Sequence, residues 1–210
     1  MQLEGWTSPA GKRRVLARLD ACERRRYERA VALAFPDPRI GPSVFGSPAP
    51  AVPLAAERRR WRSAVRARTA SARSVIVSDV ADCYPSVGEH AIRAAAARAG
   101  GDARPLLRAL RRYRQAGGLG IPIGPTASGL VADAVLALAD DRAAAAGCAP
   151  LRWVDDVVFA GDRDAVARAA RAWRQALIEL GMREHDGKRT AEPVLRSPER
   201  VSDRGIMRGT

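Results

Sequence analysis

The sequence predicts an α+β fold in which helices pack on one face of a small antiparallel sheet, and two short apolar segments lead to this prediction. Residues 74–80 (SVIVSDV) are rich in β-branched side chains, which is typical of a buried strand. Residues 151–160 (LRWVDDVVFA) place a pair of aspartates between two apolar runs, which predicts a β-hairpin. With the helical segments, the order from residue 74 is β-α-α-loop-α-β-β-α-β, and this order predicts a two-layer sandwich.

The chain before residue 74 is predicted to be basic and mostly helical. Residues 12–35 carry a broken apolar stripe and predict a first helix. Residues 36–53 contain six prolines and predict a linker or extended arm without a regular element. Residues 54–69 predict a second basic helix, in which Trp61 lies among arginines. Two interpretations stay open for Trp61: it stacks on bases beside phosphate contacts, or the helix merely has a solvated face.

Helices and turns follow in the rest of the chain. Helices are predicted at residues 89–99, 105–115, 126–146 and 162–180, and a short strand at residues 193–195. A rigid Gly/Pro loop at residues 120–125 precedes the third of these helices. Trp173 belongs to an apolar stripe and is expected in the core. We expect an N-terminal basic arm at residues 1–53, a catalytic domain at residues 54–195 and a loose tail at residues 196–210.

Composition excludes several classes of protein. There is no run of 18 uncharged apolar residues, so we expect no transmembrane helix and no membrane partner. The N-terminus lacks the basic-then-apolar pattern of a signal peptide. Cys22, Cys83 and Cys148 are odd in number and far apart, which favours a reducing compartment over a disulfide framework or a zinc site. The expected location is cytoplasmic.

The charge of the chain predicts a polyanionic partner. The formal net charge is +13, from 36 basic and 23 acidic residues, and this balance favours nucleic acid. Nearly all the basic residues are arginines and alanine is abundant, a composition that a GC-rich genome also produces. Lys12 and Lys188 are the two lysines, and a lysine, unlike an arginine, can give up its proton.

Three carboxylates mark a candidate metal site. Asp79 ends the first predicted strand, and Asp155 and Asp156 lie at the turn of the hairpin, so the three converge if the strands are neighbours. Two like charges about 4 Å apart repel by roughly 4 kcal/mol at an effective dielectric constant near 20. A fold keeps such a pair together where a cation binds. The alternative is a solvated turn, in which aspartate is common.

The chemistry of these carboxylates points to magnesium. Hard oxygen ligands suit Mg²⁺, which usually binds one or two protein carboxylates together with substrate phosphates. Two such ions about 3.5–4 Å apart stabilise the attacking and leaving oxygens of an in-line displacement at phosphorus. A basic chain, an acidic metal centre and a Gly/Pro loop together indicate nucleotidyl transfer on nucleic acid, with two Mg²⁺ ions as cofactor and Mn²⁺ as a substitute.

Four segments, in order along the chain, resemble the palm motifs of reverse transcriptases. They are residues 79–87 (DVADCYPSV), 120–128 (GIPIGPTAS), 153–156 (WVDD, similar to Tyr-x-Asp-Asp) and 180–190 (LGMREHDGKRT). The resemblance covers residues 75–190 and implies a two-layer polymerase palm. The Tyr-Pro-Ser-Val and Gly-Ile-Pro-Ile-Gly-Pro strings are most similar to bacterial reverse transcriptases linked to phage defence, including the abortive-infection type.

The resemblance implies roles in metal binding and catalysis. Asp79 and Asp155 would bind both metal ions, Asp156 would assist, and the carbonyl of Val80 would complete the site. Lys188 would face the pyrophosphate as charge partner or proton donor. The alternative for Lys188 is an exposed lysine in a turn.

The resemblance also implies roles in substrate binding. Tyr84 would lie under the incoming sugar and exclude a 2′-hydroxyl, which selects dNTPs; the alternative is a core aromatic. Gly120, Pro122 and Gly124 would let the backbone approach the nascent base pair, and Ser128 would begin the supporting helix. The alternative for these four residues is a plain helix-capping loop.

The chain departs from the family pattern in sequence and in size. Trp153 replaces the usual Tyr and Cys83 the usual Phe, and both replacements are still apolar. The fingers are reduced and helical, the basic finger strands that contact a template are not evident, and neither is a thumb. Grip on primer and template would then come from a partner chain, an oligomer or a structured RNA.

The expected function is that of an RNA-directed DNA polymerase, which adds dNTPs to a 3′-hydroxyl on an RNA template, in bacterial antiphage defence. One alternative is a reduced palm that binds nucleic acid or a partner protein without polymerising. Another is a different palm enzyme, such as a primase-like or cyclic-nucleotide synthase, against which Tyr84 argues.

Overall fold

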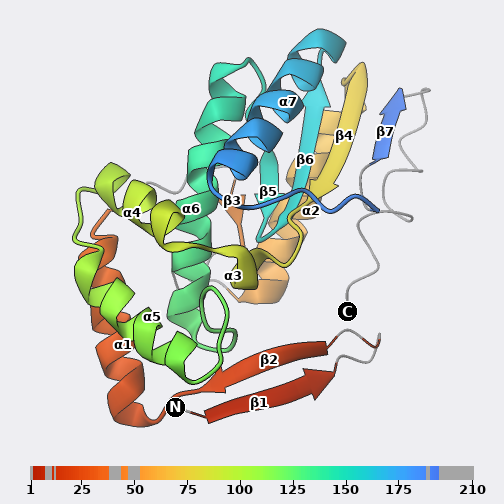
Figure 1. The fold of residues 1–210 in the computed structure, drawn as a ribbon. Coiled ribbons are helices and arrows are strands. Elements are labelled where there is room, and N and C mark those ends of the chain that lie inside the picture. The colour runs from red at the N-terminus through yellow and green to blue at the C-terminus, as the bar shows by residue number, and fades with distance from the viewer. Residues whose placement is uncertain are drawn as a thin grey trace. The chain divides into compact units, whose positions relative to one another are not determined.

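Figure 1 shows the computed structural model of the chain, which describes residues 2–7, 11, 13–37, 44–46, 53–187 and 190–193. The chain divides into two compact units. Unit 1 comprises Met1–Ile40 and Asp82–Ala137, and unit 2 comprises Gly41–Ala81 and Leu138–Thr210. Each unit is therefore built from two separate stretches of chain, and the division does not follow the boundary expected after residue 53.

Unit 1 combines a β-hairpin with helices. Its elements are β1 (Gln2–Thr7), β2 (Arg13–Arg18), α1 (Ala21–Ala34), α3 (Cys83–Ser86), α4 (Glu89–Arg98), α5 (Arg104–Gln115) and the first part of α6 (Thr126–Ala145). Strands β1 and β2 are antiparallel, with Gln2 opposite Arg18 and Thr7 opposite Arg13. Helix α1 packs against α5 (Figure 1), so the apolar faces of both helices are buried within this unit.

The single helix predicted at residues 12–35 is wrong in its first part, because Arg13–Arg18 form strand β2. The helix begins only after Asp20, whose side chain accepts hydrogen bonds from the backbone N–H groups of Cys22 and Glu23. The Glu23 side chain in turn accepts a bond from the Asp20 backbone. This capping box is a helix start signal that the sequence carries. A basic hairpin that was not evident from the sequence is thus part of unit 1.

Unit 2 is built on a mixed sheet. Its strands are β3 (Val44–Phe45), β4 (Ser74–Asp79), β5 (Leu151–Trp153), β6 (Asp156–Gly161) and β7 (Thr190–Pro193), in the order β3-β5-β6-β4-β7. All neighbours are antiparallel except β3 and β5, which are parallel. The strand predicted from residue 74 and the hairpin after residue 150 are confirmed. Strand β3 contradicts the expectation that the proline-rich stretch holds no regular element, and β7 begins earlier than predicted.

Helices cover both faces of this sheet (Figure 1). They are α2 (Leu54–Ala70) on one face and α7 (Arg163–Glu179) on the other. On the first face, Trp61 lies in an apolar cluster with Val75 and Val158. On the opposite face, the ring of Trp173 meets that of Phe159 edge-on, with the centroids 6.0 Å apart. The two-layer arrangement expected from the sequence therefore has a third layer.

The prediction that helices cover one face is wrong, and the apolar residues of β6 show why. Residues 157–160 are all buried, and a strand that is apolar on both sides must be covered on both sides. Trp61 and Trp173 belong to the two covering helices, and each is 1 % exposed. The core position predicted for Trp173 is confirmed. The interpretation of Trp61 as a base-stacking residue is wrong.

Candidate functional site

The pairing of β4 with β6 places two of the predicted carboxylates directly opposite each other. Asp79 pairs with Asp156 in the ladder, and the next pair is joined by a bond from the Val80 N–H to the Asp155 carbonyl, 3.2 Å long. Because bonded and non-bonded pairs alternate, Asp79 and Asp156 form a non-hydrogen-bonded pair, whose Cα atoms typically lie about 4.5 Å apart. Asp79 is 3 % exposed. Like charges at opposite positions destabilise a sheet, which makes this pair a candidate for binding a cation.

The turn between β5 and β6 is strained. Trp153 pairs with Asp156, which leaves Val154 and Asp155 as a two-residue turn. Val154 has a φ of +55°. A β-branched residue rarely adopts this conformation, which persists only where the surrounding structure enforces it.

A buried arginine holds this turn. Arg152 is 0 % exposed, and its Nη1 donates to the carbonyl of Val154 at 2.8 Å. Its Nε donates to Oδ2 of Asp140 in α6 at 2.8 Å, and the other oxygen of Asp140 accepts a bond from Trp173 Nε1 at 3.2 Å. A chain of hydrogen bonds therefore runs from α7 through α6 to the carbonyl of the strained residue. The arginine of this ion pair is fully buried and the aspartate partly buried, so losing either partner should destabilise unit 2.

The segment after α7 lies along the other side of the end of β4. The N–H of His185 donates to the carbonyl of Asp79 at 2.8 Å, and Val80 forms a bridge with Glu184. The Glu184 carboxylate accepts a bond from Ser78 Oγ at 2.7 Å and one from Arg174 Nε at 2.5 Å. The end of β4 is thus held between the hairpin and the segment that resembles the fourth palm motif.

Arg152 and Glu184 were missed from the sequence. A charged residue inside an apolar strand, as in Leu151-Arg152-Trp153, is a signal that could have identified Arg152, because a buried charge needs a partner. Glu184 carries no comparable signal. Its partners Ser78 and Arg174 are distant in sequence, and only the pairing of strands brings them together.

The oxygen ligands at the hairpin fit magnesium only in part. Among the described residues, no group of three or more His, Cys, Asp or Glu side chains is arranged to hold a metal ion. What the fold does supply is the Asp79–Asp156 pair, with Asp155 beside it in the turn. That pair meets the smaller requirement of Mg²⁺, which often binds one or two carboxylates and completes its shell with waters and substrate phosphates. Lys188 lies outside the described residues.

In unit 1, the Gly/Pro loop lies against the residues that follow the first motif. The N–H of Ile121 donates to the carbonyl of Tyr84 at 3.0 Å. Gly120 has a φ of +61°, and a Cβ at this position would lie 2.2 Å from the Tyr84 carbonyl oxygen and 2.5 Å from that of Pro85. Only glycine fits there. Tyr84 and Gly120, both predicted to bind substrate, are therefore neighbours.

The rest of the loop is held by β2 and α1. The N–H of Ala17 donates to the carbonyl of Ile123 at 2.8 Å, and a Cβ on Gly124 would lie 3.0 Å from the Ala17 carbonyl oxygen. Pro122 is buried. Ser128 is 0 % exposed, and its hydroxyl bonds to that of Tyr27 at 2.9 Å. Burial raises the pKa of Tyr27, and the bond to Ser128 opposes this only in part. The Ser128 hydroxyl thus joins α6 to α1.

The predicted site residues are distributed over both units. Asp79, Val80, Asp155 and Asp156 belong to unit 2, whereas Tyr84, Gly120, Pro122, Gly124 and Ser128 belong to unit 1. Within each unit the structure brings the predicted residues together, as carboxylates on adjacent strands and as a loop against Tyr84.

The sequence matches no protein-family model and no curated protein. In the part of the chain that the structure describes, no helix has the length and apolar character needed to cross a membrane.

Proposed function

We propose that the chain is an RNA-directed DNA polymerase that joins dNTPs to a 3′-hydroxyl with the help of two Mg²⁺ ions, which Mn²⁺ can replace. The observation that carries this proposal is the register of β4 and β6. It sets Asp79 opposite Asp156, the first residue of β6 after the hairpin turn. These two carboxylates come from the first and third of the four segments that resemble the palm motifs. Motifs far apart in the sequence thus meet as the proposed chemistry requires.

In the reaction, the 3′-hydroxyl of the primer gives up its proton to water, and its oxygen forms a bond to the α-phosphorus of the dNTP while the bond from that phosphorus to the pyrophosphate oxygen breaks. When bound, Mg²⁺ would supply electrostatic stabilisation of the attacking and leaving oxygens. Asp79, Asp155 and Asp156 would hold the ions, and the Val80 carbonyl would complete the site. Lys188 compensates the charge of the leaving pyrophosphate or protonates it. Positioning and electrostatics supply most of the acceleration.

The unit 1 residues are proposed to bind the substrate. Tyr84 lies under the sugar and excludes the 2′-hydroxyl of an NTP, while Gly120, Pro122 and Gly124 bring the backbone close to the new base pair. The close contact between Gly120 and the Tyr84 carbonyl supports these proposed roles. Ser128 holds the helix that follows. A partner chain, a second copy or a structured RNA provides the remaining grip, and the resemblance favours a role in antiphage defence in the bacterial cytoplasm.

The test is dNTP incorporation by the purified chain with Mg²⁺ or Mn²⁺. Primed RNA, primed DNA and no template are compared in parallel, and the matched control is the Asp155→Asn/Asp156→Asn double variant. We expect incorporation on primed RNA by the native chain and none by the variant. Equal signals from both proteins would refute the proposal, and incorporation of NTPs instead of dNTPs would point to the primase-like or cyclic-nucleotide synthase alternative.

One observation favours a second candidate, a palm that binds nucleic acid or a partner protein without polymerising. No three metal-binding side chains are gathered among the described residues. This candidate predicts no incorporation on any template, together with equal nucleic-acid binding by the native chain and the double variant.

A further inference from the structure

Helix α5 presents four arginines on one side, and we call Arg104, Arg108, Arg111 and Arg112 the arginine face. All four are exposed. Their spacing of four, three and one places them on one stripe of the helix, about 12 Å long at a rise of 1.5 Å per residue. The opposite side of α5 carries buried Leu106, Leu107, Leu110 and Tyr113. The helix is thus fixed in unit 1 by its apolar side and directs its charge outward.

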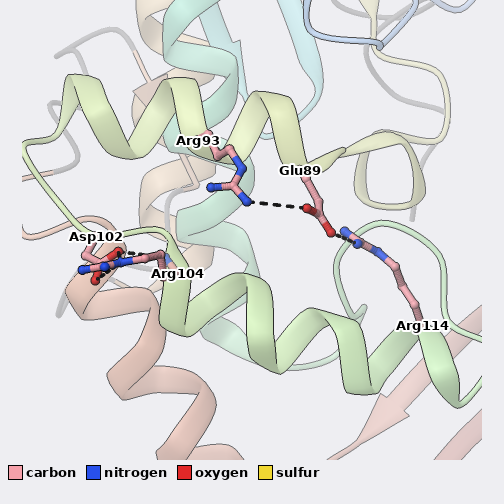
Figure 2. A network of polar contacts seen from close by, with 5 residues as sticks. All are labelled: Glu89, Arg93, Asp102, Arg104 and Arg114. Carbon is pink, nitrogen blue, oxygen red and sulfur yellow. Dashed lines mark hydrogen bonds and ion pairs between the residues drawn. The ribbon is translucent and has the colours of Figure 1, made fainter.

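The acids near α5 pair with the arginines at its two ends. Figure 2 shows Glu89 between Arg93 of α4 and Arg114 of α5, and Asp102 beside Arg104. The Arg104–Asp102 contact is 2.9 Å long. Helix α5 itself contains no acidic residue. Among the described residues, no ion pair is formed by the remaining three members of the arginine face, Arg108, Arg111 and Arg112.

Genomic composition alone does not explain this pattern, because α7 of the same chain is different. The exposed side of α7 mixes Arg168 and Arg171 with Asp164, Glu179 and the apolar Ile178. The arginine face of α5, in contrast, contains no acidic and no apolar side chain. Like charges three or four residues apart destabilise a helix by about 0.2–0.5 kcal/mol per pair, so such a face carries a small cost that an anionic partner would relieve.

We propose that the arginine face of α5 binds the phosphate backbone of nucleic acid. Guanidinium groups pair with phosphates in a bidentate manner. A strand of duplex carries one phosphate per roughly 3.4 Å of axis, so a stripe of about 12 Å faces three to four phosphates. An anionic membrane fits less well, because the apolar side that would enter the bilayer is already buried in unit 1.

This inference goes beyond the proposed polymerase and does not depend on it. It shares with that function only the class of partner, and it assigns binding to a surface that contains none of the proposed catalytic residues. It predicts a grip on the backbone that is independent of sequence and sensitive to salt.

The experiment measures binding of fluorescein-labelled 20-nucleotide RNA and DNA, single-stranded and duplex, by fluorescence anisotropy between 50 and 300 mM KCl. The native chain is compared with Arg108→Gln/Arg111→Gln/Arg112→Gln. The matched control is Arg163→Gln/Arg168→Gln/Arg171→Gln on α7, which removes the same charge from exposed positions. A third variant, with lysines at the three α5 positions, keeps the charge. Circular dichroism checks that all fold.

We expect the α5 glutamine variant to lose roughly tenfold or more in affinity at 100 mM KCl, and its slope of log K against log[KCl] to fall by about 2–3. The control should change the slope by less than about 1, and the lysine variant should bind nearly as the native chain does. Equal losses from α5 and α7 would overturn the proposal, and so would binding of the native chain to phosphatidylserine vesicles or polyglutamate but not to the oligonucleotides. If the native chain binds the oligonucleotides and loses this binding in the α5 glutamine variant, but incorporates no dNTP, only the polymerase proposal fails.

Discussion

The hairpin of unit 2 and the arginine face of unit 1 use charge in opposite ways. At the hairpin, Asp79 is 3 % exposed and Arg152 is 0 % exposed, and each is held by bonds to a defined backbone or side-chain group. On α5, Arg108, Arg111 and Arg112 are exposed to water. Burying a charge costs desolvation free energy, so buried charges are kept where their exact position is needed. Exposed charges act mainly through the total electrostatic potential that they produce together. Single substitutions should therefore have large effects at the hairpin and small effects on α5.

The largest effect is expected at the buried ion pair. Arg152→Met removes the guanidinium from the partly buried Asp140 carboxylate and should lower the free energy of unfolding by about 3 kcal/mol, the lower end of the range for a broken buried pair. Arg152→Met/Asp140→Leu should recover much of this stability, because apolar side chains often replace a buried pair at little cost, although the Trp173 N–H loses its acceptor. Denaturant unfolding of both variants measures these changes.

The same double variant should not recover dNTP incorporation, because the Val154 carbonyl has lost the donor that holds the turn. Arg152→Lys is the conservative control and should keep part of the activity. If incorporation returned together with stability, Arg152 would contribute only to folding. Its bond to the Val154 carbonyl would then have no role in positioning the turn for activity.

A second large effect is expected at the backbone of the Gly/Pro loop. Gly120→Ala should destabilise unit 1 by several kcal/mol, because its Cβ would meet the carbonyls of Tyr84 and Pro85. The matched control is Gly100→Ala. Gly100 has a similar φ of +67° but open space around it, so only the conformational cost of about 1–2 kcal/mol should appear. Thermal or denaturant unfolding compares the two, and equal losses would contradict the close approach of the loop to Tyr84.

On the arginine face, a single change should have little effect. Arg108→Gln should alter the free energy of unfolding by less than about 0.5 kcal/mol, as is usual for exposed sites. It should lower the salt slope of nucleic-acid binding by about 1. Unfolding and anisotropy titrations test the two statements. A loss of stability as large as that of Arg152→Met would remove the distinction between the two regions.

The smallest effect concerns pH. Backbone N–H groups of Ala165 and Asp164 donate to Asp162 at the start of α7 and lower the pKa of its carboxyl. A group with a lowered folded pKa stabilises the fold above its ordinary value of 3.8, and this contribution is lost as the pH falls through the lower folded pKa. Asp162→Asn keeps the cap without the charge, so its unfolding midpoint should fall less steeply below pH 4. Identical profiles for both proteins would exclude this contribution.

Local patterns predicted much of the fold. The apolar run at β4 and the hairpin followed from strand patterns, and helices α2, α4, α5, α6 and α7 followed from helical spacing within a few residues. The α+β class is confirmed. Strand β2 and the third layer were not predicted, because pairing with Gln2–Thr7 and burial of both sheet faces are tertiary effects.

The sequence predicted most residues of the candidate site but not how they are arranged. Three separate motifs supplied the carboxylates and the loop, but the opposition of Asp79 and Asp156 depends on strand register, which no single segment specifies. Arg152 and Asp140 were missed because their pairing joins a strand to a helix. The role of Lys188 stays a prediction.

The carboxylates Asp79, Asp155 and Asp156 are proposed to bind a divalent cation, and thermal unfolding with and without Mg²⁺ tests this binding without depending on catalysis. A cation at about ten times its dissociation constant adds about 1.4 kcal/mol, which for a chain of this size raises Tm by roughly 3–6 °C. The native chain, at constant ionic strength, should show such a rise with MgCl₂, and Asp79→Asn/Asp156→Asn should not. If the units unfold separately, only the transition of unit 2 should move. Equal rises of Tm in both proteins, or no rise in either up to tens of millimolar Mg²⁺, would contradict cation binding by these carboxylates.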